Sequence, residues 1–434
     1  MKRTRYVQVG VGGRARSFYE SIASDYTDRA ELVGFCDLNQ TRMNYANRVL
    51  ADQFGHAPVP TYGADAFDRM VAECTPDVVI VTSIDRTHHR YIVRALELGC
   101  DAITEKPMTV DAGKCQQILD AVERTGRNLR VTFNYRYSPH ASLVRQLLMD
   151  GVIGTVTAVH FEWLLDLVHG ADYFRRWHRD KRNSGGLLVH KATHHFDLIN
   201  FWLASAPQTV MAFGDLRFYG HENAEERGVT SFYTRARGSE AARDDPFALH
   251  LEESEALTEM YLKAEHEDGY FRDQSVFGDG ISIEDTMALL VRYDSGAMMS
   301  YSLTAYSPWE GLRIALTGDR GRLELTVRES SYVNAQGSKS QEGVAREREL
   351  RICPHFAEPY EVKIPEPEGG HGGADPLLAA DLFGDPKPDP LRRAASHIDG
   401  AMSILTGIAG NISMDTGNAV HPQRLVRWPA GAPT

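Results

Sequence analysis

The chain has 434 residues, a formal net charge of −12 and an ordinary globular composition, with 42% hydrophobic residues. One compact core rarely takes this length, so we expect two domains. The acidic balance disfavours binding to nucleic acid or to an anionic membrane surface, because both repel an acidic protein at long range.

The first residues, MKRTRYVQVGVGG, are basic, but Gln8 and Gly10 break the apolar run and leave it too short for a signal peptide. No stretch approaches the roughly 20 apolar residues of a membrane-spanning helix. Five widely spaced cysteines without a CxxC pair indicate reduced thiols, none of them catalytic. We therefore expect a soluble, cytoplasmic protein.

Strands and helices alternate in the first part of the chain. Strands are predicted at 5–11, 30–38, 76–83, 101–107 and 129–135, and helices at 40–54, 64–74, 89–99 and 111–126, besides one in the dozen residues after the first strand. Continuous apolar runs such as PDVVIVTS are typical of strands buried on both faces. The pattern predicts an α/β domain over residues 1–136, a Rossmann fold with a doubly wound parallel sheet.

After residue 136 the pattern changes to helices and hairpins. Helices are predicted at 141–150 and 186–203, and strands at 155–165, 287–306 and 312–327, with turns at Asp294–Gly296 and Gly318–Gly321. This succession predicts an α+β domain over residues 137–434, with an open, mostly antiparallel sheet. Because the exposed faces of such sheets often pair, we expect a homo-oligomer.

Three segments of this second domain lie outside its regular elements. The charged, partly helical stretch 236–275 is interpreted as an inserted arm, and residues 334–348 and 384–390 as polar loops. Asp375 is predicted to be the N-cap of a helix that begins at Pro376. His371, just before it, is a further candidate for contact with the substrate.

A glycine motif, GVGGRA, follows the first predicted strand directly. Gly10 permits the tight turn, Gly12 lets the backbone approach a pyrophosphate, and Ala15 allows close helix packing. Asp37 ends the second strand, where a carboxylate accepts the ribose hydroxyls and repels the extra phosphate of NADP. Such turns also occur for packing reasons alone, but this context favours a dinucleotide site that takes NAD rather than NADP.

A Glu-Lys-Pro triplet, residues 105–107, lies at the carboxyl end of a predicted parallel strand. Open α/β sheets bind ligands at this edge, and Pro107 restricts the backbone so that Lys106 points reproducibly. The other interpretation is a strand-end ion pair followed by a helix-starting turn. The triplet alone does not decide between the two.

The segment GGLLVHKATHHFDL, residues 185–198, holds three histidines, a lysine and an aspartate within eight positions. His190 and His194 are four apart on the predicted helix and share a face, so they could bind zinc. The glutamate of HExxH is absent and no third ligand is evident, so we expect no metal. His195 and Asp197 fit caps or pairs within the domain. For His190, Lys191 and His194 the residues alone leave open proton transfer, substrate binding and the polar edge of a buried helix.

Together these motifs resemble those of the Gfo/Idh/MocA oxidoreductases, the family of glucose-fructose oxidoreductase and the inositol dehydrogenases. The similarity runs along nearly the whole chain and is weakest at about 218–280. It rests on GVGGRA, Asp37, Glu105-Lys106-Pro107, NYRYSP at 134–139, SGGLLVHKATHHFDL at 184–198, DGAMSILTGIAGNIS and TGNAV.

The resemblance implies specific roles for three side chains. Lys106 would hydrogen-bond the sugar hydroxyl being oxidised, Glu105 would help to hold the nicotinamide half of NAD, and His194 would take the hydroxyl proton while hydride leaves the same carbon. A histidine with a pKa of about 6.5 is a suitable base, and a lysine ammonium stabilises a developing alkoxide.

This chain departs from the family pattern just before the predicted base. The family commonly has Asp four residues before the catalytic histidine and Gly two before it, whereas this chain has His190 and Ala192, with Lys191 between them. The candidates are, for catalysis, Lys106, His194, His190 and Lys191; for the cofactor, Gly10, Gly12, Gly13, Arg14, Asp37, Thr82, Ser83, His88, Glu105, Lys106 and Asn134; and for the substrate, Tyr135, Arg136, Trp177, His178, Arg179, His195 and Arg272.

Positive charge gathers just before the histidine-rich segment, in YFRRWHRDKRNSGG at 173–186. A solvated basic loop is one interpretation. In the other, some of these side chains, together with Arg272, bind a carboxylate, phosphate or sulfonate of the substrate, as arginine geometry favours. The substrate would then be an acidic sugar.

Two functions remain open. The first is a dehydrogenase that oxidises a secondary hydroxyl of a pyranoside or cyclitol with NAD. The second, which some members of the family resemble, is an NAD-dependent glycosidase that oxidises ring carbon 3, eliminates the aglycone, adds water and returns the hydride. Its extra acid and base groups could be His190, Lys191, His195 and Tyr135. A non-catalytic NAD sensor would predict loss of Lys106 or His194, and both are present.

Overall fold

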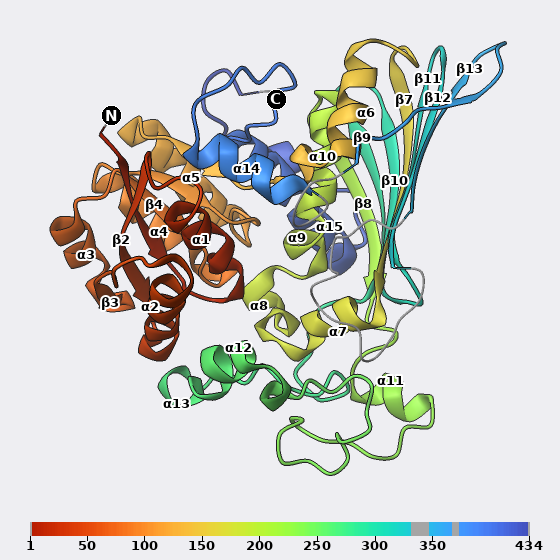
Figure 1. Ribbon diagram of the computed structural model, residues 1–434. Coiled ribbons are helices and arrows are strands. Elements are labelled where there is room, and N and C mark those ends of the chain that lie inside the picture. Colours follow the sequence, from red (N-terminus) through yellow and green to blue (C-terminus); the bar gives the residue numbers. More distant parts are fainter. Residues whose placement is uncertain (1, 331–346, 367–372, 433–434) are drawn as a thin grey trace.

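The computed structural model describes residues 2–330, 347–366 and 373–432, which form two α/β bodies side by side (Figure 1). The N-terminal body holds a six-stranded parallel sheet in the order β3-β2-β1-β4-β5-β6. The second holds an eight-stranded sheet in the order β14-β13-β12-β11-β7-β10-β9-β8, in which only the β7–β10 pair is parallel. The predicted fold class is confirmed.

The first sheet is built from strands that are buried in their last residues, as a parallel sheet covered on both faces requires. Asn39 is the N-cap of α2 and Asp111 that of α5, and the side chain of each accepts a backbone N–H group that has no partner within the helix. The strands are β1 (Thr4–Val9), β2 (Ala30–Asp37), β3 (Thr61–Gly63), β4 (Val78–Val81), β5 (Asp101–Thr104) and β6 (Leu129–Val131), and the helices are α1 (Arg16–Ala23), α2 (Gln40–Phe54), α3 (Phe67–Cys74), α4 (His88–Glu97) and α5 (Ala112–Thr125).

The second sheet has one face covered by helices, and its long strands alternate buried and accessible residues, as in β9 and β10. Both predicted hairpin turns are confirmed, between β9 and β10 and between β11 and β12. The strands are β7 (Val156–Asp166), β8 (Pro207–Asp215), β9 (Thr286–Tyr293), β10 (Met298–Ser307), β11 (Glu310–Gly318), β12 (Gly321–Ser330), β13 (Glu347–Pro354) and β14 (Tyr360–Glu361).

The helices of this half lie mainly between the two sheets (Figure 1). They are α6 (Pro139–Met149), α7 (Leu167–Arg175), α8 (Lys181–Ser184), α9 (Leu187–His190), α10 (Thr193–Leu203), α11 (His221–Glu226), α12 (Glu255–Leu257), α13 (Glu265–Asp268), α14 (Ala374–Phe383) and α15 (His397–Thr416). None of the helices in the described ranges is both long and apolar enough to cross a bilayer. All five cysteines are free thiols.

The prediction of one continuous helix at 186–203 is wrong, because the structure has two helices there, α9 and α10. The Ala192 N–H bonds the Leu187 carbonyl, five residues back, at 2.8 Å, and this ends the regular ladder. His190 therefore ends α9, and His194 lies in the first turn of α10. The two histidines belong to different helices, so the argument that residues four apart share one helix face does not apply to them.

The helix predicted to begin at Pro376 is α14, which begins at Ala374 after Gly373. Asp375 lies in its first turn and is not the N-cap, because its carboxylate is instead engaged by Arg14 and Asn134. The loop predicted at 334–348 lies outside the described residues up to residue 346, and its last two residues, Glu347 and Arg348, instead begin β13. His371, for which a substrate contact was predicted, also lies outside the described residues.

The arm at 236–275 reaches back to the first domain, where α12 and α13 lie beside α2 (Figure 1). The Arg42 guanidinium pairs with Asp268 at 2.6 Å and donates to the Met260 carbonyl at 3.0 Å. The Asn39 side chain donates to the Ala264 carbonyl at 2.9 Å. The arm is therefore attached to the nucleotide-binding half by buried polar contacts.

Helix α15 ties the two halves together. Its Ile404 and Leu405 pack in the core of the first domain, and Ala409 packs in the core of the second sheet. Just before the helix, the Ala395 carbonyl accepts the N–H of Val131 at the edge strand β6. The C-terminal part of the chain thus contributes to both cores.

Candidate active site

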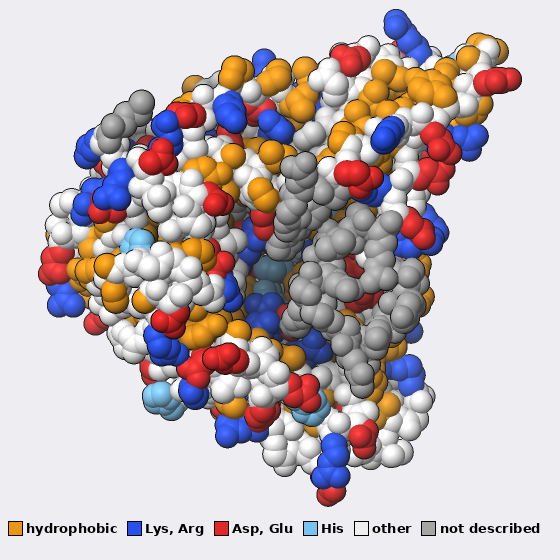
Figure 2. Space-filling view, in the orientation of Figure 1, with side chains coloured by type: hydrophobic (Ala, Val, Ile, Leu, Met, Phe, Trp, Pro, Cys, Tyr) orange, Lys and Arg blue, Asp and Glu red, His pale blue; other side chains and the backbone are white. Residues whose placement is uncertain are grey.

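A cavity of about 540 Å³ lies between the two domains. It opens at the carboxyl ends of β1, β2, β4 and β5, where open α/β sheets bind their ligands. Helices α7, α9 and α10 and the arm form its other side. Figure 2 shows this hollow in the middle of the molecule, with lysine, arginine and histidine side chains visible inside it.

The turn after β1 fits a dinucleotide. Gly10 has a φ of +82°, and a Cβ there would lie 2.5 Å from the Ser83 backbone, so only glycine allows the loops after β1 and β4 to touch. Of the atoms in the described residues, a Cβ on Gly12 or Gly13 would meet only the Tyr261 hydroxyl within 4 Å, so these residues leave the turn open on its cavity side. Such an open turn lets phosphate oxygens approach the backbone.

Asp37 ends β2 beside this turn. Its carboxylate accepts the N–H of Val11 at 2.6 Å and that of Asn39 at 2.9 Å, which fixes the side chain in the lining of the cavity. A carboxylate at this place is suited to ribose hydroxyls. The residues present therefore fit NAD.

Glu105 is held by an ion-pair network from three segments. Its Oε1 accepts from Arg14 Nε at 2.6 Å, and the other nitrogens of Arg14 reach Asp375 at 3.0 and 3.3 Å. Asn134 donates to the same Asp375 carboxylate at 2.8 Å. Burial alone would lower the pKa of Arg14, but the charges of Glu105 and Asp375 raise it. Sequence reasoning found every member except Asp375, which it had interpreted as a helix cap.

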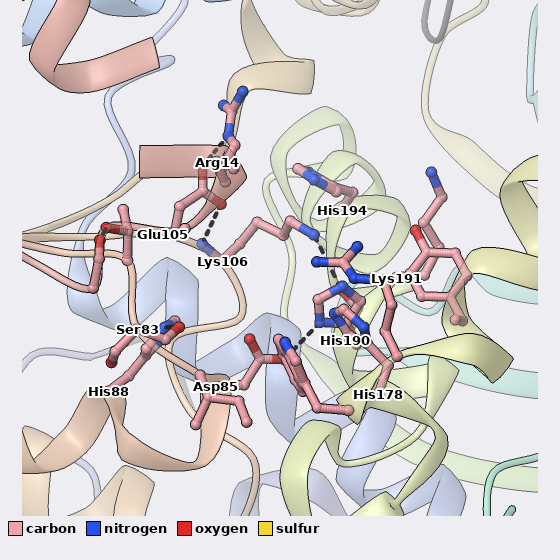
Figure 3. A pocket seen from close by; sticks show the side chains of 18 of the residues that line it. Arg14, Ser83, Asp85, His88, Glu105, Lys106, His178, His190, Lys191 and His194 are labelled. Carbon is pink, nitrogen blue, oxygen red and sulfur yellow. Dashed lines mark hydrogen bonds and ion pairs between the residues drawn. The ribbon is translucent and has the colours of Figure 1, made fainter. Parts of the chain in front are cut away.

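Lys106 extends from the end of β5 towards the second domain (Figure 3). Its Nζ donates to the His190 carbonyl at 3.4 Å. Burial lowers the pKa of Lys106 to about 8, against the charges of Glu105 and Asp85, which raise it. At neutral pH the group is therefore mostly an ammonium, but one poised to lose its proton slightly above neutrality.

His194 lines the cavity next to Tyr135. The two rings are stacked, with centroids 4.2 Å apart and an interplanar angle of 13°. Within the described residues the buried His194 Nδ1 has no hydrogen-bond partner. Burial lowers the pKa of His194 well below its ordinary value, and the charges of Lys106 and Lys191 act in the same direction. The imidazole is therefore neutral and able to accept a proton.

His190 makes the shortest polar contact between the domains in this cavity, through Nδ1 to Asp85 Oδ2 at 2.5 Å. Its ring centroid lies 4.2 Å from that of His178, which in turn stacks on Trp177. Sequence reasoning missed Asp85. The available signal was an aspartate in the loop after β4, between the predicted cofactor residues Ser83 and His88.

Lys191 is a buried ammonium. Its Nζ lies 4.6 Å from the centroid of the Trp163 ring and donates to the Tyr135 hydroxyl at 3.3 Å, and the residue is only 4% exposed. In the parts of the chain that the structure describes, no carboxylate forms an ion pair with it. An uncompensated buried charge is costly, so this side of the cavity favours an anion.

Four predicted substrate residues do not line the cavity. Arg136 pairs with Asp197, Arg179 donates to the Ser275 and Asp279 carbonyls, His195 bonds the Tyr301 hydroxyl, and Arg272 lies over the Tyr261 ring. Arg176, from the same basic segment, does line it. The other predicted residues come together in the lining: Gly10, Gly12, Gly13, Arg14, Asp37, Thr82, Ser83, His88, Glu105, Lys106, Asn134, Tyr135, Trp177, His178, His190, Lys191 and His194.

Among the residues that the structure describes, no group of three or more His, Cys, Asp or Glu side chains is placed to hold a metal ion.

Two family models match most of the chain. One, described as the NAD-binding Rossmann fold of an oxidoreductase family, GFO_IDH_MocA, matches residues 4–133. The other, described as the C-terminal alpha/beta domain of the same family, matches residues 145–421. Together they span both sides of the cavity.

Individual relatives agree with these models. A Bacillus subtilis protein named as an oxidoreductase, YteT, is 36% identical over 420 residues, 92% of this chain and 93% of that protein. Glycosyl hydrolase family 109 protein 1 of Akkermansia muciniphila is 27% identical over 44% of this chain and 41% of its own. D-glucoside 3-dehydrogenase of Escherichia coli is 30% identical over 35% of this chain and 41% of its own.

Among solved structures, that of the WlbA dehydrogenase from Bordetella pertussis in complex with NADH and UDP-GlcNAcA has a similar fold. Its TM-score is 0.60 at 19% identity, and the match covers 97% of this chain and 99% of that one.

Proposed function

Because the chain belongs to the Gfo/Idh/MocA oxidoreductase family, as its motifs predicted, we propose that it transfers hydride between NAD and a secondary hydroxyl of a sugar, a pyranoside or a cyclitol. The observation that carries the proposal is that one cavity is lined by the glycine turn, by Asp37 and, from two domains, by Lys106 and His194. NAD, when bound, supplies the acceptor for the hydride.

The protein's own groups bind the substrate and move its proton. The Lys106 ammonium donates a hydrogen bond to the reacting hydroxyl oxygen and stabilises the negative charge that develops there. A neutral histidine facing the same cavity accepts the hydroxyl proton. The family resemblance assigns this role to His194, and His190 is another of the histidines that line the cavity.

We further propose that the substrate carries an anionic group. Lys191 and Arg176 both line the cavity, but Arg176 is already paired with Asp172 at 3.0 Å, so the proposal rests on Lys191. Among the described residues the Lys191 ammonium contacts the Trp163 ring and the Tyr135 hydroxyl and forms no ion pair with a carboxylate. A carboxylate, phosphate or sulfonate of the sugar would supply the missing negative charge.

A second candidate, the NAD-dependent glycosidase, is favoured by the position of the arm. The Tyr261 hydroxyl accepts the N–H of Gly13 at 3.1 Å, directly at the turn that fits the pyrophosphate. A nucleotide held beneath the arm leaves only when the arm separates from α2. Retention of the cofactor suits a cycle that takes a hydride and returns it.

Purified enzyme incubated with neutral and anionic aryl glycosides and cyclitols should distinguish the two candidates. We expect NADH absorbance to rise in proportion to substrate consumed, without aglycone release, and to be faster with anionic members. Aglycone release without net NADH would support the glycosidase. The absence of both with every member of the panel would overturn the proposed function.

Weakening the contact between the arm and α2 should speed nucleotide release. Asp268→Asn removes the partner of the buried Arg42 guanidinium, so we expect NADH to dissociate roughly tenfold faster, because a change of about 1.4 kcal/mol is a factor of 10. Stopped-flow displacement of bound NADH, followed by its fluorescence, measures the rate. Glu259→Gln is the matched control. It removes an arm contact to the half-exposed Arg48, so we expect a smaller increase in the NADH dissociation rate. Equal rates in wild type and Asp268→Asn would show that the arm does not retain the nucleotide.

A further inference from the structure

Asp85 and His190 form a carboxylate–imidazole pair across the domain boundary. Asp85 follows β4 of the parallel sheet, whereas His190 ends α9 of the second domain. Both side chains are buried, with 5% and 11% of their areas exposed, and both line the cavity (Figure 3). Two polar groups from separate domains are thus paired at the place where the domains enclose the ligand.

The pair fixes which nitrogen of His190 carries the proton. A neutral imidazole has one N–H, and an ionised carboxylate can only accept, so with Asp85 ionised the contact at Nδ1 places the proton there. The Nε2 lone pair is then left for the cavity, since Nε2 has no hydrogen-bond partner among the described residues. Burial lowers the pKa of His190 well below its ordinary value, which keeps the free imidazole neutral.

Burial raises the pKa of Asp85 well above its ordinary value, Glu105 raises it further, and the charges of Lys106 and Arg176 act against this rise. The ionised form of Asp85 therefore depends on these two cations and on the contact with His190 Nδ1. The Lys106 ammonium also donates to the His190 backbone carbonyl at 3.4 Å. The predicted hydroxyl-binding group and the imidazole are therefore neighbours.

His194 lacks this arrangement. Its Nδ1 is buried without a partner in the described part of the chain, and its ring is stacked on Tyr135. The nearest aspartate in sequence, Asp197, is occupied by Arg136. Among the described residues, no carboxylate orients His194, whereas Asp85 contacts His190.

Resting on the proposed function, we infer that His190, oriented by Asp85, is the group that takes the proton of the sugar hydroxyl, and that His194 forms part of the surface on which the sugar ring lies. In this step the O–H bond breaks and an N–H bond forms at His190 Nε2, while the C–H electron pair leaves with the hydride. The imidazolium that results is stabilised by Asp85, a positioning residue that touches no substrate.

The protonation of His190 can be measured without any substrate. In protein with ¹⁵N-labelled histidine, long-range ¹H–¹⁵N spectra distinguish Nδ1–H from Nε2–H imidazoles, and the signals lost in His190→Gln identify the residue. We expect Nδ1–H in the wild type and a shift towards Nε2–H in Asp85→Asn, because the asparagine amide can donate to Nδ1. An Nε2–H imidazole in the wild type would overturn the assignment.

The kinetic test compares three variants on a substrate found with the glycoside panel. Asp85→Asn should lower kcat about a hundredfold with little change in KM, since a base held in the wrong tautomer binds substrate but cannot accept the proton. His190→Gln should lose at least as much. His194→Gln should act mainly on KM. A larger loss of kcat in His194→Gln than in Asp85→Asn would contradict the inference.

Two controls separate a failure of this inference from a failure of the proposed function. Asp120→Asn makes the same change in a surface ion pair with Arg427 and should leave both readouts unchanged. If no sugar is oxidised by the wild type, the proposed function fails while the nitrogen spectra still decide the tautomer. If sugars are oxidised normally by Asp85→Asn, only the role of the pair fails.

Discussion

Replacing Lys106 by methionine should lower kcat/KM roughly a thousandfold. Methionine fills a similar volume but cannot donate to the substrate oxygen or balance its developing charge, and the loss of one such group costs about 10²–10³ in rate. The effect should appear mainly in kcat, because the interaction strengthens as the alkoxide forms. NADH binding, measured by fluorescence titration, should change little.

The pH profile tests the charge state of the same residue. The pKa of Lys106 is lowered to about 8, and the ammonium form predominates below that value. If the ammonium is the active form, the wild-type rate falls as the pH rises through about 8, and the residual rate of Lys106→Met lacks this fall. A rate that rises through about 8 would instead identify the neutral amine as a base. Lys387→Met, in an exposed loop, is the control for loss of a lysine.

Replacing Arg136 by methionine should destabilise the fold by about 3–5 kcal/mol, because the change leaves buried carboxylates without their cation. The Arg136 guanidinium donates to Asp197 at 2.7 and 2.6 Å and to Asp399 at 2.9 Å, and the Arg136 and Asp197 side chains are 2% and 1% exposed. We expect the Tm to fall by roughly 10 °C, since 1 kcal/mol corresponds to about 2–4 °C in domains of 150–250 residues.

The loss of stability in Arg136→Met should depend on pH and should grow as the pH rises. Burial raises the pKa of Asp197 to about 7, and Arg136 lowers it from a still higher value. A carboxyl whose pKa is raised on folding contributes stability that is lost as pH rises through the folded value. Without Arg136 the folded pKa of Asp197 rises further, so the gap in Tm to wild type should widen as the pH rises above about 7. Differential scanning calorimetry measures it, with Arg427→Met as the surface control, and an unchanged Tm would refute the structural role of Arg136.

The fold class was predictable because both sheets have regular patterns. Buried parallel strands are continuous apolar runs, and the hairpins of the second sheet turn at glycine-containing positions such as Asp294–Gly296. The three-residue strand β3 has too few residues to show a pattern. The break between α9 and α10 was not visible either, because a change from i−4 to i−5 hydrogen bonding leaves the apolar spacing almost unaltered.

The lining of the cavity was predictable where a motif lies next to a strand end. The glycine turn, Asp37 and Lys106 follow β1, β2 and β5, whose carboxyl ends must meet. Asp375 and Asp85 were missed because their importance comes from partners 361 and 105 positions away, Arg14 and His190. The opposite error, the assignment of Arg136 to the substrate, arose because charge alone does not tell a ligand-binding guanidinium from a buried structural one.

Helix α15 and the residues just before it contribute to both cores. A hinge that opened the whole cleft would have to pull Ile404 and Leu405 out of one apolar interior or Ala409 out of the other, and exposing buried methylene groups costs about 0.8 kcal/mol each. We therefore expect substrate and nucleotide to enter and leave the cavity through small local displacements, while the two domains remain packed against each other.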